Sequence, residues 1–176
     1  MRNWMERCAR LVRHRWAEGR MNSALPGDLL QRLEQRVAAS EQSHSGEIRI
    51  CVEAGLPFSY IWRDASARER AQTLFGKLRV WDTEHNNGVL IYLLLADHAV
   101  EIVVDRALTH AVGADVWQKW VQEMTTNFRE GRYENGLNLA LSQVSAMLCE
   151  HPSATYQRNG VGLPNAPVRV AMDRDD

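Results

Sequence analysis

The sequence predicts an α/β fold: a three-layer α/β/α sandwich whose mixed sheet contains one β-hairpin, preceded by an N-terminal amphipathic helix. Three observations lead to this prediction. Residues 88–96 are an almost uninterrupted apolar run, as expected of a strand that is covered on both faces. Residues 47–53 alternate between polar and apolar side chains, which is typical of a strand with one more buried face. The segments around these strands repeat apolar residues at helical spacing.

The first helix is expected in residues 1–24, where arginines fill the positions between the apolar residues. The apolar stripe consists of Trp4, Met5, Cys8, Leu11, Val12 and Trp16. Residues 1–20 contain six arginines and two glutamates, a net charge of +4, whereas the whole chain has a net charge of −1. We expect the stripe to pack against the domain, as most amphipathic helices do. The alternative is that residues 1–20 make a peripheral contact with an anionic membrane or dock on a partner protein.

The second helix and the first strand follow directly. Leu25-Pro26-Gly27 interrupts the chain, and Asp28 is a suitable N-cap for a helix with apolar residues at helical spacing. In the strand at residues 47–53, Ile48, Ile50 and Val52 share the buried face, and Glu47, Arg49, Cys51 and Glu53 share the more exposed face.

The third helix is predicted after a loop through Pro57. Ser66 and Glu69 have the spacing of a capping box, in which a hydroxyl and a carboxylate satisfy backbone groups at a helix start. The helix is expected to run to about Leu78.

The hairpin is predicted from two apolar runs, residues 88–96 and 100–104. Asp97 and His98 between them can make a tight turn. Two further helices are expected downstream, where apolar residues again recur at helical spacing and Gly131 separates them.

The chain is expected to contain one main domain. Its 176 residues are close to the usual length of a single domain. We predict this domain at residues 25–150, after the helix at 1–24, and an irregular tail at 151–176, where the periodicity is lost.

Composition excludes several classes of protein. The charges nearly balance and no basic groove with interleaved aromatic residues can be traced, so no nucleic acid partner is expected. No uncharged run approaches the length of a transmembrane helix, and the charged first twenty residues do not resemble a secretory signal. The three cysteines are far apart and odd in number, as in a reducing compartment. We expect a cytoplasmic protein.

Tightly spaced catalytic motifs are absent. The sequence contains neither the nucleophile elbow Gly-x-Ser-x-Gly nor the zinc-protease motif His-Glu-x-x-His. Gly76-Lys77 lacks the other residues of a P-loop. No catalytic residue is predicted.

One polar loop stands out, because residues 81–96 read WDTEHNNGVLIYLLLA and the acidic and amide side chains directly precede a buried strand. Loops at strand ends of open α/β sheets often bind ligands, and oxygen ligands suit calcium or magnesium. Asp105 is expected near the same edge, because an antiparallel strand ends where its neighbour begins. The candidate ligand cleft comprises Asp82, Glu84, His85, Asn86, Asn87, Asp105, Arg106 and Thr109, with Asp82, Asn86 and Asp105 as candidate metal ligands. The alternative is a solvated loop whose Asn-Gly pair supplies a positive φ.

Three stretches of the chain resemble the TPM domain, whose members include thylakoid-lumen phosphatase-like proteins, photosystem repair factors and a nematode receptor auxiliary protein. The stretches are GEIRICVE, FGKLRVWDTEHNNGVLIYLLLADHAVEIVVDRAL and FREGRYENGLNLALSQV. Positions that match the family pattern are Gly46, Glu47, Asn87, Gly88, Val89, Leu90, Phe128, Gly131, Tyr133, Gly136 and Leu137. The resemblance agrees with the predicted sandwich and implies a stand-alone member.

The chain departs from the family pattern at two acidic positions. Asn86 stands where the family has the aspartate of Asp-Asn-Gly, and Thr109 stands where it has the glutamate of Gly-aromatic-Gly-Leu-Glu. The resemblance implies that these acidic residues are calcium ligands, so their replacement removes charge that would hold a cation, and Arg106 adds opposing charge. We expect that no cofactor is required and that calcium or magnesium binds weakly at most.

Two functions remain as expectations. The first is a non-catalytic adaptor module that binds a ligand or a protein partner through the candidate cleft. The second, implied by the plant-type relatives, is a divalent-cation-dependent phosphatase-like hydrolase in which Asp82, Glu84 or Asp105 holds the cation.

Overall fold

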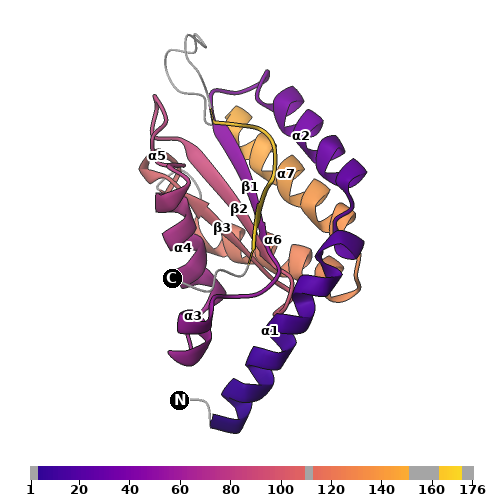
Figure 1. Cartoon of the computed structure of the whole chain (residues 1–176). Coiled ribbons are helices and arrows are strands. Elements are labelled where there is room, and N and C mark those ends of the chain that lie inside the picture. The colour runs from indigo at the N-terminus through magenta and orange to yellow at the C-terminus, as the bar shows by residue number, and fades with distance from the viewer. Residues whose placement is uncertain (1–3, 110–112, 151–162, 172–176) are drawn as a thin grey trace.

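A four-stranded mixed sheet forms the centre of the computed structural model, which describes residues 4–109, 113–150 and 163–171 (Figure 1). The strand order is β3-β2-β1-β4. β1 is parallel to both β2 and β4, and β2 and β3 form the predicted antiparallel hairpin. The strands span β1 (Glu47–Glu53), β2 (Gly88–Leu94), β3 (Ala99–Val104) and β4 (Val168–Val170).

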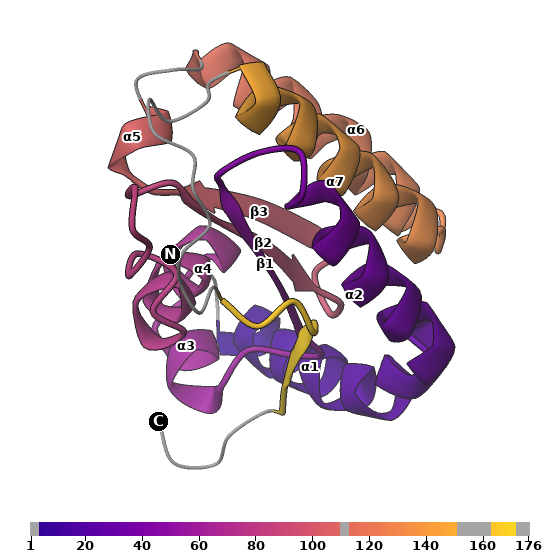
Figure 2. The ribbon, with the colours of Figure 1, turned by 90° about the horizontal axis from the view of Figure 1, so that it is seen from above.

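Helices cover both faces of the sheet, which confirms the α/β/α sandwich (Figure 2). One face packs against α2 (Gly27–Ser40), α6 (Ala114–Arg129) and α7 (Tyr133–Glu150). The other packs against α3 (Phe58–Trp62) and α4 (Ala67–Lys77), and a short helix, α5 (Arg106–Thr109), follows β3. The sequence predicted α4 from its capping box, and the Ser66 hydroxyl does accept from the Glu69 N–H at 3.1 Å. α3 lies where the sequence predicted only a loop.

β2 is the central strand, and all of its residues are buried. Val89, Ile91 and Leu93 pack toward α2 and α7, whereas Leu90, Tyr92 and Leu94 pack toward α4. Burying such a side chain stabilises the fold by roughly 1.5–3 kcal/mol. This two-sided burial explains why the run lacks the alternation of a half-exposed strand.

β1 departs from its predicted alternation in its second half. Cys51 and Glu53, expected on the more exposed face, are fully buried because α4 covers them. The Arg70 guanidinium of α4 satisfies the Glu53 carboxylate, with Nη2 2.8 Å from Oε1.

The predicted irregular tail is wrong for residues 168–170, which form β4. They pair in parallel with residues 51–53 of β1. A three-residue strand is too short to show an alternating pattern, and the partner that orders it lies more than a hundred residues upstream. The remainder of the predicted tail, residues 151–162 and 172–176, lies outside the described residues.

The orientation of the N-terminal helix, α1 (Trp4–Ala24), differs from the prediction for most of its apolar stripe. Its buried residues are Arg10, His14 and Ala17. Most of the apolar stripe faces outward instead, with Trp4, Met5, Val12 and Trp16 exposed, whereas Leu11 is half-buried and packs against the core cluster that contains Ile61. The sequence pattern failed here because Arg10 and His14 meet specific polar partners, which offset the cost of taking them out of water.

Candidate functional site

The predicted cleft lies at the edge of the sheet where β1 and β2 begin. Asp82, Glu84 and Asn86 are exposed on the loop before β2, His85 is half-buried, and Asn87 is buried. The Asn87 backbone N–H donates to the Thr83 hydroxyl at 3.1 Å, which closes the loop on itself. The Asn87 amide donates to the Ser45 hydroxyl at 3.2 Å, so the loop is also tied to the segment before β1.

The Asn-Asn-Gly sequence has two separate structural roles. Asn86 adopts a φ of 50°, which asparagine tolerates better than most residues. Gly88 is needed for a different reason, because a Cβ there would lie 1.9 Å from the Val80 carbonyl oxygen. The turn interpretation therefore explains these residues without a ligand.

Asp105 lies beside this loop, as the antiparallel pairing predicted. Its N–H donates to the Gly88 carbonyl at 3.0 Å. Its side chain is 6% exposed, with Oδ1 accepting from the Arg106 N–H at 2.6 Å. Oδ2 accepts no hydrogen bond from any described residue. Asp105 is therefore the one predicted metal ligand that is held in a buried position.

The other predicted residues of this turn point elsewhere. Arg106 is exposed. The Thr109 hydroxyl donates back to the Asp105 carbonyl at 3.1 Å, and Thr109 lines a separate hollow of about 780 Å³ beside β3 and α6. Thr109 thus does not join the loop of residues 82–87.

These residues do not fit a tightly held cation. Within residues 4–109, 113–150 and 163–171, no three His, Cys, Asp or Glu side chains lie close enough to share a metal ion. Calcium requires six to eight oxygen ligands, whereas Asp82 and Asn86 are exposed on their loop and Asp105 is buried.

A polar network that sequence analysis missed lies at the opposite edge, where α1 crosses the ends of β1 and β2. Arg10 is 5% exposed, and its guanidinium donates to the Asp97 carboxylate and to the Ala65 carbonyl, both at 3.0 Å. His14 is fully buried, and its Nδ1 accepts from the Leu56 N–H at 2.9 Å, which leaves its hydrogen on Nε2, 3.2 Å from Asp97. Burial alone would raise the pKa of Asp97, but the hydrogen bonds from His14 and Arg10 and the charge of Arg10 outweigh it and hold that pKa well below its usual value.

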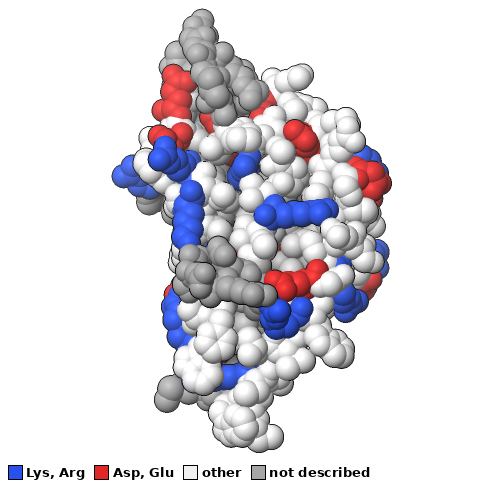
Figure 3. All heavy atoms as spheres, viewed as in Figure 1, with Lys and Arg blue, Asp and Glu red and all other residues white. Residues whose placement is uncertain are grey.

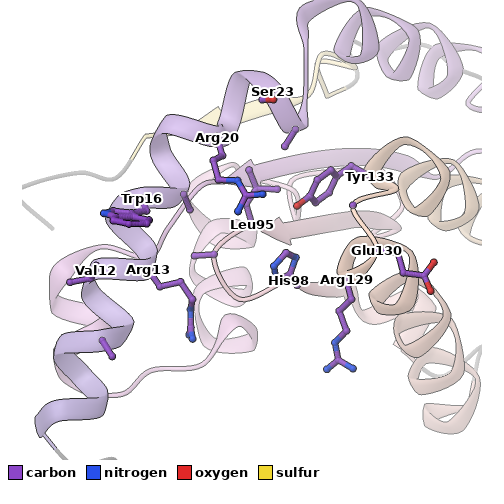
Figure 4. Close-up of a pocket in the computed structure, with 15 residues that line it drawn as sticks. Val12, Arg13, Trp16, Arg20, Ser23, Leu95, His98, Arg129, Glu130 and Tyr133 are labelled. Atoms are coloured by element: carbon purple, nitrogen blue, oxygen red, sulfur yellow. The ribbon is translucent and has the colours of Figure 1, made fainter.

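α1 thereby fills the crevice at the strand ends that ligands often occupy in open α/β sheets. The approach is close, because a Cβ on Gly55 would lie 2.7 Å from the His14 carbonyl oxygen. What remains open is a groove of about 800 Å³ between α1 and the turn that joins α6 to α7, called the α1 groove below. Its walls include Val12, Arg13, Trp16, Arg20, Arg129 and Tyr133 (Figure 4).

The α1 groove is basic and partly aromatic. Arg20 lies on α1 and Arg129 at the end of α6, across the groove. The one acidic residue in its lining, Glu130, is ion-paired with Arg132. At the bottom of the groove, His98 Nδ1 lies 3.2 Å from the Phe128 carbonyl oxygen, and this contact joins the hairpin turn to α6. This combination suits a ligand that carries negative charge beside an apolar group.

A second buried polar cluster is structural. Glu53 and Tyr92 are fully buried and Arg70 is 2% exposed. The Tyr92 hydroxyl donates to Glu53 at 2.6 Å, and Arg70 donates to the same carboxylate through Nε and Nη2. Nearby, burial raises the pKa of the Cys51 thiol to about 12, so this thiol is a poor nucleophile. The cluster ties α4 to the sheet and offers no access to a substrate.

The chain is similar to a known domain family and to two solved structures. The family model of the TPM domain matches residues 21–147. The NMR structure of the BA42 protein from the psychrophilic bacterium Bizionia argentinensis aligns with a TM-score of 0.69 and 22% identity, covering 83% of this chain and 95% of that protein. An NMR structure of the N-terminal domain of a P. gingivalis protein aligns with a TM-score of 0.60 and 20% identity, covering 77% and 85% respectively. No curated protein matches the chain.

At these identities the two solved structures establish similarity of fold alone. The family match begins at residue 21, so the part of α1 that carries Arg10, His14 and the exposed stripe precedes it.

Proposed function

This chain belongs to the TPM domain family, and we propose that it is a non-catalytic binding module that holds an acidic segment of a protein partner in the α1 groove. The observation that carries the proposal is that Arg20 of α1 and Arg129 at the end of α6 both line the groove, together with Trp16 and Tyr133. Arginine recognises carboxylates through its planar set of donors, and aromatic rings bury the apolar part of a bound segment.

The carboxylates at the predicted cleft favour binding over phosphatase chemistry. Metal-assisted hydrolysis needs ligands that converge on a cation. Asp82 and Glu84 are exposed on their loop, whereas Asp105 is buried and directs Oδ1 to the Arg106 N–H. The proposed function requires no cofactor. Weak calcium or magnesium binding near Asp105 is compatible with it.

A labelled peptide of alternating glutamate and leucine tests the proposal, with a glutamine-leucine peptide as its neutral match. We expect the acidic peptide to bind more tightly, and added salt to weaken it. The double variant Arg20→Glu and Arg129→Glu should weaken binding at least roughly tenfold, because charge-assisted hydrogen bonds contribute about 1.5–3 kcal/mol each. Arg36→Glu, at an exposed position on α2, is the matched control.

Two results would contradict this function. One is equal affinity for the acidic and the neutral peptide, or no effect of the double variant. The other is hydrolysis of p-nitrophenyl phosphate that needs a divalent ion and disappears in Asp82→Ala, which would establish the phosphatase instead.

A further inference from the structure

We infer that the outward face of α1 docks this protein on an anionic lipid surface. The inference concerns a different surface from the α1 groove, because it rests on the side of α1 that points away from the sheet. Val12 and Trp16 stand on the rim shared by the two surfaces.

The outward face is a continuous apolar stripe. Trp4, Cys8, Val12 and Trp16 follow one another at every fourth residue, which places them along one side of a helix. Trp4 is 70% exposed and Trp16 is 78% exposed. Met5, also exposed, lies next to the stripe. Two tryptophans exposed to this degree on one helix face indicate a surface that is covered in function.

The exposure is fixed by the fold. Rotating α1 to bury the stripe would remove Arg10 from Asp97 and His14 from the Leu56 N–H. Each lost contact would either leave a buried polar group without a hydrogen-bond partner or move a charged group out into water. The polar side of α1 is therefore bound to the domain and its apolar side is directed outward.

α3 extends the apolar surface. Phe58 and Trp62 are 54% and 58% exposed, and their rings stack with centroids 5.7 Å apart. α3 lies beside the N-terminal half of α1, where Leu11 packs in the same core cluster as Ile61. Figure 3 shows that the lower end of this view, over α1 and α3, is largely uncharged. The two helices thus present aromatic side chains at one end of the molecule.

The charges around the stripe select an anionic lipid surface as its occupant. Residues 1–20 carry a net charge of +4 by sequence, although Arg10 is buried against Asp97 on the inward side of α1. The side chains of Arg13 and Arg15 are about half exposed and are ion-paired with Asp97 and Glu18, so they present their charge at the surface only in part. Tryptophan and phenylalanine flanked by arginine are suited to the boundary between lipid headgroups and acyl chains, where the rings are buried and the guanidinium groups meet phosphates. No helix within the described residues is apolar enough over a sufficient length to cross a bilayer, so α1 is expected to lie in the plane of the surface.

Co-flotation of the full chain with vesicles tests the inference. We expect binding to vesicles of phosphatidylcholine mixed with phosphatidylglycerol, and little binding to phosphatidylcholine alone. High salt should reduce the bound fraction, because screening weakens the attraction of the arginines. Arg15→Gln should lower the partition coefficient about fivefold, since one basic residue near an anionic surface contributes about 1 kcal/mol.

Exposed tryptophans provide a matched pair of variants. Trp4→Ser with Trp16→Ser should lower vesicle binding at least about tenfold, because two large apolar side chains are lost from the interface. Trp81→Ser is the control, since Trp81 is also 51% exposed but lies in the loop at the opposite edge of the sheet. All of these side chains are at the surface, so the variants should fold, which circular dichroism can verify.

The two exposed cysteines give a second, independent readout. A polarity-sensitive fluorophore on Cys8, in a Cys149→Ser background, should shift to the blue with anionic vesicles. The same fluorophore on Cys149, in a Cys8→Ser background, should not shift, because Cys149 lies on α7.

The inference is overturned if the full chain does not float with anionic vesicles, if it binds neutral vesicles equally, or if the Trp4 and Trp16 variant binds like the control. Dimerisation that is lost in that variant without vesicle binding would assign the stripe to a second copy of the chain and would also overturn it. Arg129→Glu, on α6, separates this inference from the proposed function: it should weaken peptide binding and leave vesicle binding unchanged.

Discussion

The Arg10 guanidinium lies 3.0 Å from the Asp97 carboxylate, joining the N-terminal helix to the turn of the β2–β3 hairpin across 87 positions of sequence. Arg13 adds a second ion pair to the same carboxylate. This contact, together with His14, determines which side of α1 faces the domain. It therefore also determines that the tryptophans face outward.

Asp97 should make the stability of the protein dependent on acid. Its folded-state pKa lies below the unfolded value of about 3.9, so its contribution is fully present above that pH and is lost as the pH falls toward the folded-state pKa. Asp97→Asn should reduce this loss. At neutral pH it should destabilise the fold by up to about 3 kcal/mol, because the buried Arg10 would lose its closest counter-charge and keep the longer, 3.5 Å contact with Asp64. Urea unfolding of both proteins at neutral and acidic pH measures both effects, and equal pH profiles would contradict the assignment.

The buried pair of Glu53 and Arg70 should be costly to break from one side. Arg70→Met leaves the Glu53 carboxylate buried without its guanidinium, and we expect a loss of about 3–5 kcal/mol in the free energy of unfolding. Adding Glu53→Gln removes the uncompensated charge and should recover part of that loss. Denaturant titration measures the free energy of unfolding of the single and double variants. A double variant that is no more stable than Arg70→Met alone would be inconsistent with an ion pair.

Gly88 and Gly76 should respond oppositely to alanine. A Cβ at Gly88 would collide with the Val80 carbonyl, so Gly88→Ala should cost more than about 2 kcal/mol. A Cβ at Gly76 meets nothing within 4 Å, and this residue lies in α4, where alanine is the better helix former. Gly76→Ala should therefore be neutral or stabilise by up to about 1 kcal/mol. Thermal unfolding compares the two, and similar melting temperatures would contradict the close approach at Gly88.

The three cysteines should differ in reactivity. Cys8 and Cys149 are exposed, whereas Cys51 is buried and its pKa is raised to about 12 by burial. A thiol reagent at mildly alkaline pH should modify Cys8 and Cys149 in the folded protein and reach Cys51 only after unfolding. Peptide mass mapping with and without denaturant checks this, and modification of Cys51 in the native protein would show that the sheet opens locally.

Calcium and magnesium should perturb the predicted cleft weakly. Amide NMR titration should give small shifts confined to residues 82–88 and 105–109, and only at about millimolar concentrations, because few carboxylates are available there. Asp105→Asn should remove the shifts, and Glu34→Gln on the exposed side of α2 should keep them. Tight binding would show instead that this edge forms a complete metal site.

Most of the fold could be predicted from periodicity. The capping box at Ser66 and Glu69 marked the start of α4, and the apolar run from Gly88 marked a strand covered on both faces. These signals are local, because each arises from residues close together in sequence. The candidate site was less predictable. The pairing rule correctly placed Asp105 beside Gly88, but nothing in the sequence showed that Asp82 is exposed while Asp105 is buried.

The sequence by itself determined the longer helices of the sandwich, the hairpin and the membership in a family, because hydrophobic spacing and short motifs encode these locally. Tertiary structure alone decided the direction of α1, the addition of β4 to the sheet and the α1 groove. Each depends on partners far apart in the chain, such as Arg10 with Asp97 and Val168 with Cys51. A side chain's hydrophobicity predicts burial only on average, and specific polar partners can reverse it, as Arg10 and His14 do on α1.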